Sequence, residues 1–119
     1  MEISLYDTNG KATMYIADDG ETVYSWDGYA KCYIIDEAIY GWRGKHLGWF
    51  SQGFVCDLDG CSIGYTKDVS PRILFTESTK WTKKTQWTKS QRRMAQIKPF
   101  FKTTESHLSL AEYLGSDSP

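Results

Sequence analysis

The twelve residues IYGWRGKHLGWF, from Ile39 to Phe50, are one copy of a unit that the chain contains four times. The other copies are LYDTNGKATMYI (Leu5–Ile16), VYSWDGYAKCYI (Val23–Ile34) and VCDLDGCSIGYT (Val55–Thr66). Their central glycines, Gly10, Gly28, Gly44 and Gly60, are 18, 16 and 16 residues apart. A nearly constant period is typical of a repeat architecture in which each unit packs on its neighbours.

Each unit is predicted to be a β-hairpin that turns at its glycine. The turn dipeptides are Asn9-Gly10, Asp27-Gly28, Arg43-Gly44 and Asp59-Gly60. Asn-Gly and Asp-Gly between β-rich runs favour a two-residue type I′ turn, in which both central residues have positive φ. With the glycine numbered zero, such a turn pairs position −4 with +3 and position −5 with +4.

The predicted pairing gives every hairpin two different faces. One face carries positions −5, −3, +2, +4 and +6, where aliphatic and small residues suit close packing around an axis. The other carries −4, −2, +1, +3 and +5, where tyrosine and tryptophan gather. Because no hairpin buries such faces alone, we expect an all-β fold of four short hairpins around a pseudo-fourfold axis. A closed ring also leaves few exposed strand edges.

Charge divides the chain into three predicted parts. Residues 1–77 form the four-repeat hairpin domain, with 12 acidic and 6 basic residues. Residues 78–104 form a basic extended strap packed on that domain, with 8 basic residues and no acidic one. Residues 105–119 form a short helix and a frayed end. In this last part Ser109 and Glu112 match a capping box, Leu108 and Tyr113 a hydrophobic staple, and Gly115 a helix stop.

Length and composition predict a single soluble domain in the cytoplasm. The chain has 119 residues, no apolar stretch long enough for a membrane span, and no signal-peptide pattern at its start. Cys32, Cys56 and Cys61 are an odd number of cysteines, which argues against a disulfide framework. We expect them to be small buried hydrophobic residues.

The four units resemble the 4-fold β-flower family, a group of small, mostly bacterial domains. The segment Gly44-Lys45-His46-Leu47-Gly48-Trp49-Phe50 carries the resemblance most clearly, and it extends over residues 3–66. Lys98-Pro99-Phe100-Phe101 and the segment Ser109–Leu114 match more loosely. The resemblance implies a fold, and it implies no catalytic or binding residue.

The function that we favour from the sequence is that of a non-enzymatic interaction module. Its partner would be a protein, a peptide or a small ligand, bound by aromatic residues between repeats or in a pocket along the axis. The candidate ligand-binding residues are Tyr24, Trp26, Tyr40, Trp42 and His46. Packing among themselves is the simpler use of these aromatics, and any part left exposed is the best binding surface on offer.

An alternative function is binding of a polyanion or nucleic acid through the strap. Its candidate residues are Trp81, Lys83, Lys84, Trp87, Lys89, Arg92 and Arg93. The simpler interpretation is that the strap lies on its own acidic domain, with Trp81 and Trp87 against the ring. The acidic domain would also repel nucleic acid, so this alternative is not favoured.

Catalysis is the least supported function. The two histidines, His46 and His107, lie in no metal-binding spacing, and no cofactor motif is present. A small hydrolase-like enzyme would need His46 to meet Cys32 or Cys61 in the fold. The paired aspartates at equivalent positions have a sufficient local use, because Asp bonds its own turn.

Overall fold

The computed structural model describes residues 2–70, 74, 77, 80, 82–84, 89, 105 and 108–117. Eight strands follow each other: β1 (Ile3–Asp7), β2 (Ala12–Ile16), β3 (Thr22–Ser25), β4 (Ala30–Ile35), β5 (Ala38–Gly41), β6 (His46–Ser51), β7 (Phe54–Asp57) and β8 (Ser62–Tyr65). A 3-10 helix, η1 (Lys67–Val69), comes next, and an α-helix, α1 (Leu110–Leu114), lies near the end. No helix in this described part of the chain is long and apolar enough to cross a membrane.

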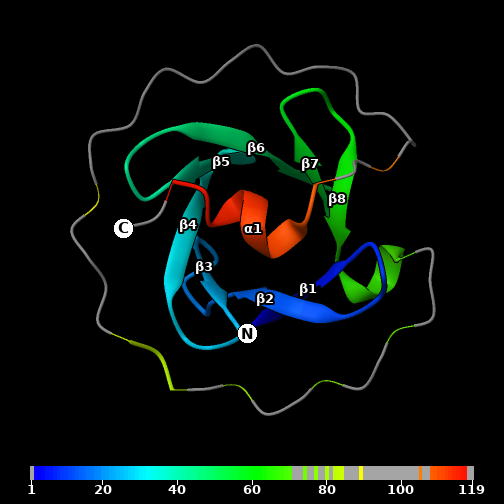
Figure 1. Cartoon of the computed structure of the whole chain (residues 1–119), viewed down its shortest axis with the longest axis horizontal. Helices are drawn as coiled ribbons and strands as arrows, with labels where there is room; N and C mark the ends of the chain where they lie inside the picture. The colour runs from blue at the N-terminus through cyan, green and yellow to red at the C-terminus, as the bar shows by residue number, and fades with distance from the viewer. Residues whose placement is uncertain are drawn as a thin grey trace.

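The eight strands form a closed antiparallel barrel, with each strand paired to the next along the chain (Figure 1). The ring closes where β1 pairs with β8, through Tyr6 with Tyr65 and Asp7 with Gly64. Each repeat unit is one hairpin, so the predicted all-β fold of four hairpins is confirmed. Closure gives every strand two neighbours, which removes the free edges of an open sheet.

The hairpin turns lie at the predicted glycines, but their type differs from the prediction. In the first hairpin the N–H of Gly10 donates to the Asp7 carbonyl at 3.0 Å, and the N–H of Asp7 donates to the Lys11 carbonyl at 2.9 Å. The loop therefore has three residues, and Gly10 has the positive φ of 86°. Asn9 has no positive φ, so this is a type I turn closed by a glycine bulge and not a type I′ turn.

A second irregularity offsets the longer loop. Tyr6 pairs with Ala12, so position −4 faces +2 and not +3 as the two-residue turn predicted. Leu5 nevertheless pairs with Met14, which is the predicted pairing of −5 with +4. The residue at +3 is an extra residue in a β-bulge, and the same shift occurs in all four hairpins.

The bulge changes which side chains face the barrel axis. Positions −5, +4 and +6 supply the core, as predicted, and the bulged +3 residues Leu47 and Ile63 join them, fully buried. Position +2 turns outward, where His46 packs against the aromatic residues. The predicted faces were therefore wrong at +2 and +3. Buried side chains from all four hairpins form one cluster in the barrel core.

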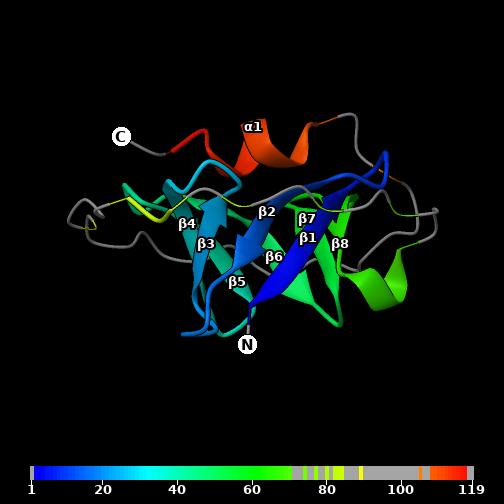
Figure 2. The ribbon, with the colours of Figure 1, turned by 90° about the horizontal axis from the view of Figure 1, so that it is seen from below.

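Helix α1 covers the end of the barrel that carries the glycine turns (Figure 2). Its Leu110 and Leu114 are buried in the barrel core, and the Tyr113 hydroxyl donates to the Leu47 carbonyl at 2.5 Å. The predicted helix is present, but the Ser109 side chain makes no capping hydrogen bond, and Gly115 has a right-handed φ of −87°. Leu108 is exposed, so apolar burial and not the predicted capping box holds α1 in place.

The last described residue, Asp117, completes the third hairpin. In the first and fourth hairpins the aspartate at −3 accepts the N–H of the residue at +1: Asp7 from Lys11 at 3.0 Å, and Asp57 from Cys61 at 2.9 Å. The third hairpin has Gly41 at −3, and a Cβ built there would lie 2.2 Å from the Asp117 Cβ. The Asp117 carboxylate accepts the N–H of Lys45 at 2.9 Å and so takes the missing side chain's role.

Candidate functional site

The repeat places three aromatic rings at the junction between the first and second hairpins. Tyr15 (+5 of one hairpin) lies opposite Tyr24 (−4 of the next), and their rings stack with centroids 5.6 Å apart. Trp26, at −2, meets Tyr15 edge-on at 5.7 Å. Directly opposed aromatic residues stabilise an antiparallel strand pair, which explains why the repeat keeps rings at these positions. We call Tyr15, Tyr24 and Trp26 the first aromatic trio.

The same arrangement recurs at the next junction. Tyr33 stacks on Tyr40 with centroids 5.8 Å apart, and Trp42 meets Tyr33 edge-on, also at 5.8 Å. The planes of the edge-on pair are at 87°, against 88° in the first trio. Tyr33, Tyr40 and Trp42 form the second aromatic trio. The two trios match because they occupy the same three repeat positions on successive hairpins.

Lysines of the strap lie over the first aromatic trio. The Lys80 ammonium is 4.6 Å from the Tyr15 centroid and 5.1 Å from that of Trp26, and the Lys83 ammonium is 5.3 Å from that of Tyr24. These distances are within the range of cation–π attraction. Glu2 pairs with both cations, at 2.9 Å from Lys80 and 3.1 Å from Lys83.

Lys89 lies over the second aromatic trio in the same way. The Lys89 ammonium is 4.4 Å from the Tyr33 centroid and 5.1 Å from the Trp42 centroid. Glu21 approaches it at 3.3 Å, and both charged side chains are partly exposed. Each trio thus binds an ammonium group between a tyrosine and a tryptophan face, with a carboxylate beside it.

Charge pairing over the first trio favours the ionised forms of Glu2 and Lys83. Hydrogen bonds from Lys80 and Lys83 lower the pKa of the Glu2 carboxyl. The hydrogen bond to Glu2 raises the pKa of Lys83. Burial raises the pKa of Tyr15, whose phenol therefore stays neutral beneath the cations. The site is a set of neutral rings and a fixed negative charge, which is the chemistry that recognises an organic cation.

The fourth junction, where β8 meets β1, binds carboxylates instead. The Tyr6 hydroxyl donates to Glu77 at 2.7 Å, and the Tyr65 hydroxyl donates to Glu105 at 2.6 Å. Burial, together with Glu77, raises the pKa of Tyr6 to about 12, while the hydrogen bond from Tyr6 lowers the pKa of Glu77. Glu77 and Glu105, which flank the strap in the sequence, are therefore both bound by tyrosine hydroxyls.

These contacts place most of the residues proposed from the sequence. Tyr24 and Trp26 belong to the first trio, and Tyr40 and Trp42 to the second. Lys84 donates its backbone N–H to the Gly28 carbonyl at 2.8 Å. Trp81, Trp87, Arg92 and Arg93, with their predicted roles in docking or polyanion binding, lie outside the described residues, as does His107.

His46 lies beside the second trio and has a structural contact of its own. Its ring is buried, with Nε2 2.9 Å from the Gly48 carbonyl, and it meets Trp49 edge-on at 4.6 Å. Burial lowers its pKa, which favours the neutral imidazole. No group of three or more His, Cys, Asp or Glu residues that could hold a metal ion occurs among the described residues.

All three cysteines are free thiols. Burial in the barrel core raises the pKa of Cys32, and burial raises that of Cys56 to about 11. A higher pKa reduces the thiolate fraction, which is the opposite of what a nucleophile needs. Asp7 and Asp57 hold their own turns, as the bonds described above show.

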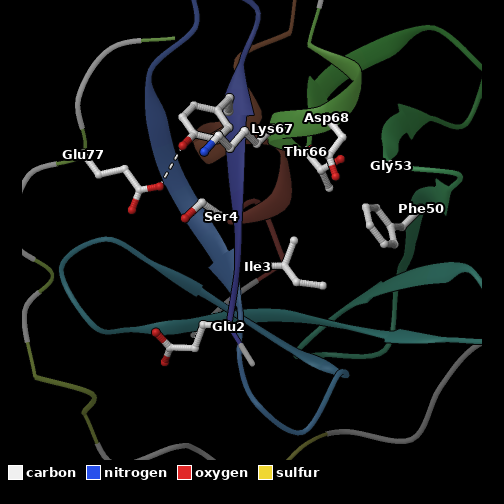
Figure 3. A pocket seen from close by; sticks show the side chains of 10 residues that line it. Glu2, Ile3, Ser4, Phe50, Gly53, Thr66, Lys67, Asp68 and Glu77 are labelled. Atoms are coloured by element: carbon white, nitrogen blue, oxygen red, sulfur yellow. Dashed lines mark hydrogen bonds between the residues drawn. The ribbon is translucent and has the colours of Figure 1, made fainter.

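A cavity of about 570 Å³ opens beside β1 and η1 (Figure 3). It is lined by Glu2, Ile3, Ser4, Tyr6, Phe50, Gly53, Thr66, Lys67, Asp68 and Glu77. Ile3 and Phe50 give it an apolar part, and the Tyr6–Glu77 hydrogen bond spans one wall. The cavity lies outside the barrel core, on the side of Glu2, which precedes β1 and pairs with the lysines over the first trio.

Two residues of the trios and several of the charged groups beside them were not identified from the sequence. Tyr15 and Tyr33 carry the +5 aromatic signal that the repeat made visible, but they were not proposed as ligand residues. Lys80 was visible as part of the basic strap. Glu2 and Glu21 gave no signal, because neither belongs to a repeat position.

The family model described as 4-fold beta flower protein matches residues 3–114. The chain belongs to this family. The match extends past the four hairpins to α1. Comparison with curated proteins and with solved structures finds no match.

Proposed function

We propose that this β-flower protein is a binding module that recognises lysine side chains of an extended peptide through its two aromatic trios. The observation that carries the proposal is the recurrence of one geometry. Lys80 and Lys89 lie at 4.6 and 4.4 Å from equivalent tyrosines, and both lie 5.1 Å from equivalent tryptophans. Because the same contact occurs at two equivalent positions of the repeat, we attribute it to the barrel and not to chance.

The chain's own strap is, in this proposal, the resident occupant of both trios. A partly exposed cation–π contact contributes about 0.5–1 kcal/mol, so several weak contacts hold the strap. A partner peptide binds only when the strap leaves, which lowers its apparent affinity by the fraction of open molecules. The free thiols fit a reducing compartment such as the cytoplasm.

The test compares two triple variants of the full chain. Lys80→Ala, Lys83→Ala and Lys89→Ala together empty the trios. A matched control removes the same charge from three exposed lysines away from the trios: Lys11, Lys45 and Lys67. A fluorescent peptide with the sequence of residues 77–89 is titrated into each protein, and its anisotropy is measured. We expect the trio variant to bind the peptide at least about ten-fold more tightly than wild type, and the control to match wild type.

The same variants separate this proposal from polyanion binding. If the strap binds polyanions, the trio variant loses retention on heparin far more than the control does, and its peptide affinity does not rise. That pair of results would overturn the proposal. Trp42→Leu in the trio-variant background should weaken peptide binding again, because it removes one wall of the second trio and leaves the first trio intact.

A further inference from the structure

We propose that the second aromatic trio prefers a trimethylated ammonium group to a bare one. This inference rests on the proposed function and names the ligand class of one of its two sites. The ligand is a peptide lysine bearing three methyl groups on Nζ. The argument comes from the distances at Lys89, from the acceptors around it, and from the contrast with the first trio.

The ring distances leave room for methyl groups. Lys89 Nζ lies 5.1 Å from the Trp42 centroid, and an N–C bond of about 1.5 Å pointing at that ring leaves the methyl carbon about 3.6 Å away. Over Tyr33, at 4.4 Å, three methyl groups straddling the nitrogen axis lie about 3.9 Å above the ring. Both heights fall in the range of about 3.5–4.0 Å that is optimal for carbon contacts.

The second trio holds its cation mainly by ring faces. A lysine ammonium has three N–H donors. The Lys89 charge also acts on Asp19, but both oxygens of that carboxylate accept hydrogen bonds from Glu21 and Thr22 in their own turn. The carboxylate that pairs directly with Lys89 among the described residues is Glu21, at 3.3 Å, with 40% of its side chain exposed. An ion pair so exposed contributes little, so trimethylation, which keeps the charge and removes the donors, costs little there. A bare ammonium is also strongly hydrated, and its transfer onto two ring faces is penalised more.

The first trio has the opposite balance. Glu2 accepts from Lys80 at 2.9 Å and from Lys83 at 3.1 Å, so two charge-assisted hydrogen bonds depend on bare N–H groups. Trimethylation of either lysine removes its bond to Glu2. The barrel therefore reads an unmodified lysine at the first trio and a methylated one at the second.

The experiment uses full-length protein with Lys89→Ala, which empties the second trio alone. Peptides of residues 84–94 carry at position 89 either lysine, trimethyllysine or uncharged norleucine, and free tetramethylammonium is a fourth probe. Binding is followed by the NMR shift of the Trp42 indole N–H. We expect trimethyllysine to bind at least about five-fold more tightly than lysine, and norleucine to bind more weakly than either. Glu21→Gln should weaken the lysine peptide more than the trimethyllysine peptide.

Each outcome decides the matter. Equal or tighter binding of the lysine peptide overturns this inference and leaves the proposed function standing. Failure of both charged peptides, with Trp42 unmoved, overturns both. Tetramethylammonium binding as tightly as the trimethyllysine peptide assigns the site to a free quaternary ammonium compound and overturns the peptide as its source. Lys80→Ala combined with Lys83→Ala empties the first trio, and peptides of residues 78–88 modified at position 80 should there show the reverse order, with unmodified lysine preferred.

Discussion

The side chain of Asp117 occupies the space that a side chain at Gly41 would fill. An aspartate introduced at position 41 should therefore be able to replace the Asp117 carboxylate. Asp117→Ala removes the hydrogen bond from the Lys45 N–H, which is 2.9 Å long. A net charge-assisted bond is worth about 1.5–3 kcal/mol, and since this one is exposed we take about 1.5 kcal/mol. For a domain of this size that lowers Tm by about 6 °C.

Gly41→Asp alone should also destabilise the protein. The new Cβ would lie 2.2 Å from that of Asp117, so the C-terminal segment must leave, and such overpacking costs about 1–3 kcal/mol. The double variant should be no less stable than Gly41→Asp alone, because a displaced Asp117 no longer contributes its hydrogen bond, and this gives a coupling of about 1.5 kcal/mol. Its aspartate then sits at −3, as Asp7 and Asp57 do in their hairpins.

Urea unfolding of the four proteins, followed by tryptophan fluorescence, measures this cycle. Asp7→Ala combined with Asp117→Ala serves as the control, and its effects should add because the two aspartates serve different turns. If the energies of Gly41→Asp and Asp117→Ala also add, Asp117 does not replace a turn side chain and the reasoning is refuted.

Further predictions concern packing, pH and thiol chemistry. Gly48→Ala should lower stability by about 1–3 kcal/mol in thermal unfolding, and Gly64→Ala should lower it less. A Cβ at position 48 would lie 2.0 Å from strand backbone, whereas a Cβ at position 64 would lie 2.9 Å from the flexible end of a leucine. The pKa of Glu77 is lower in the folded protein than its ordinary value of 4.5. Its ionised carboxylate therefore stabilises the fold fully above pH 4.5, and this stabilisation is lost as the pH falls through the lower folded pKa. Wild type should therefore lose more Tm than Glu77→Gln on acidification from pH 5, and equal losses would contradict this. In native protein a maleimide should label Cys61, which is half-buried, well before Cys32; simultaneous labelling would show that the core opens.

The repeat made the hairpins predictable, because a glycine that needs positive φ recurs at one period. The β-bulge was not predictable, since the bulged residues Thr13, Lys31, Leu47 and Ile63 share no chemistry. The turn type failed for a related reason: Asn-Gly and Asp-Gly also suit a type I turn that ends in a glycine bulge. The three-residue loop shifts the strand register by one residue and the bulge shifts it back, so the pairing of −5 with +4 is the predicted one.

The candidate site was predictable only in part. The tyrosines and tryptophans at fixed repeat positions pointed to aromatic clusters, and the charge segregation pointed to a strap on an acidic domain. Which lysine meets which ring depends on the path of a segment with no periodic signal. Glu2 and Glu21 reach their lysines across 78 and 68 residues of chain, and such pairs emerge only from the folded barrel.

The closure of the ring between β1 and β8 has a kinetic consequence. Seven of the eight strand pairs join neighbours along the chain and form locally, but the eighth must bring together residues as distant as Tyr6 and Tyr65. Until that contact forms, the sheet is open and presents two unpaired edges to other molecules. Refolding should therefore divide between intramolecular closure, whose rate is independent of concentration, and edge-to-edge association, whose rate grows with it. The yield of monomer on dilution from denaturant should fall as protein concentration rises, while the native barrel stays inert to association at the same concentrations.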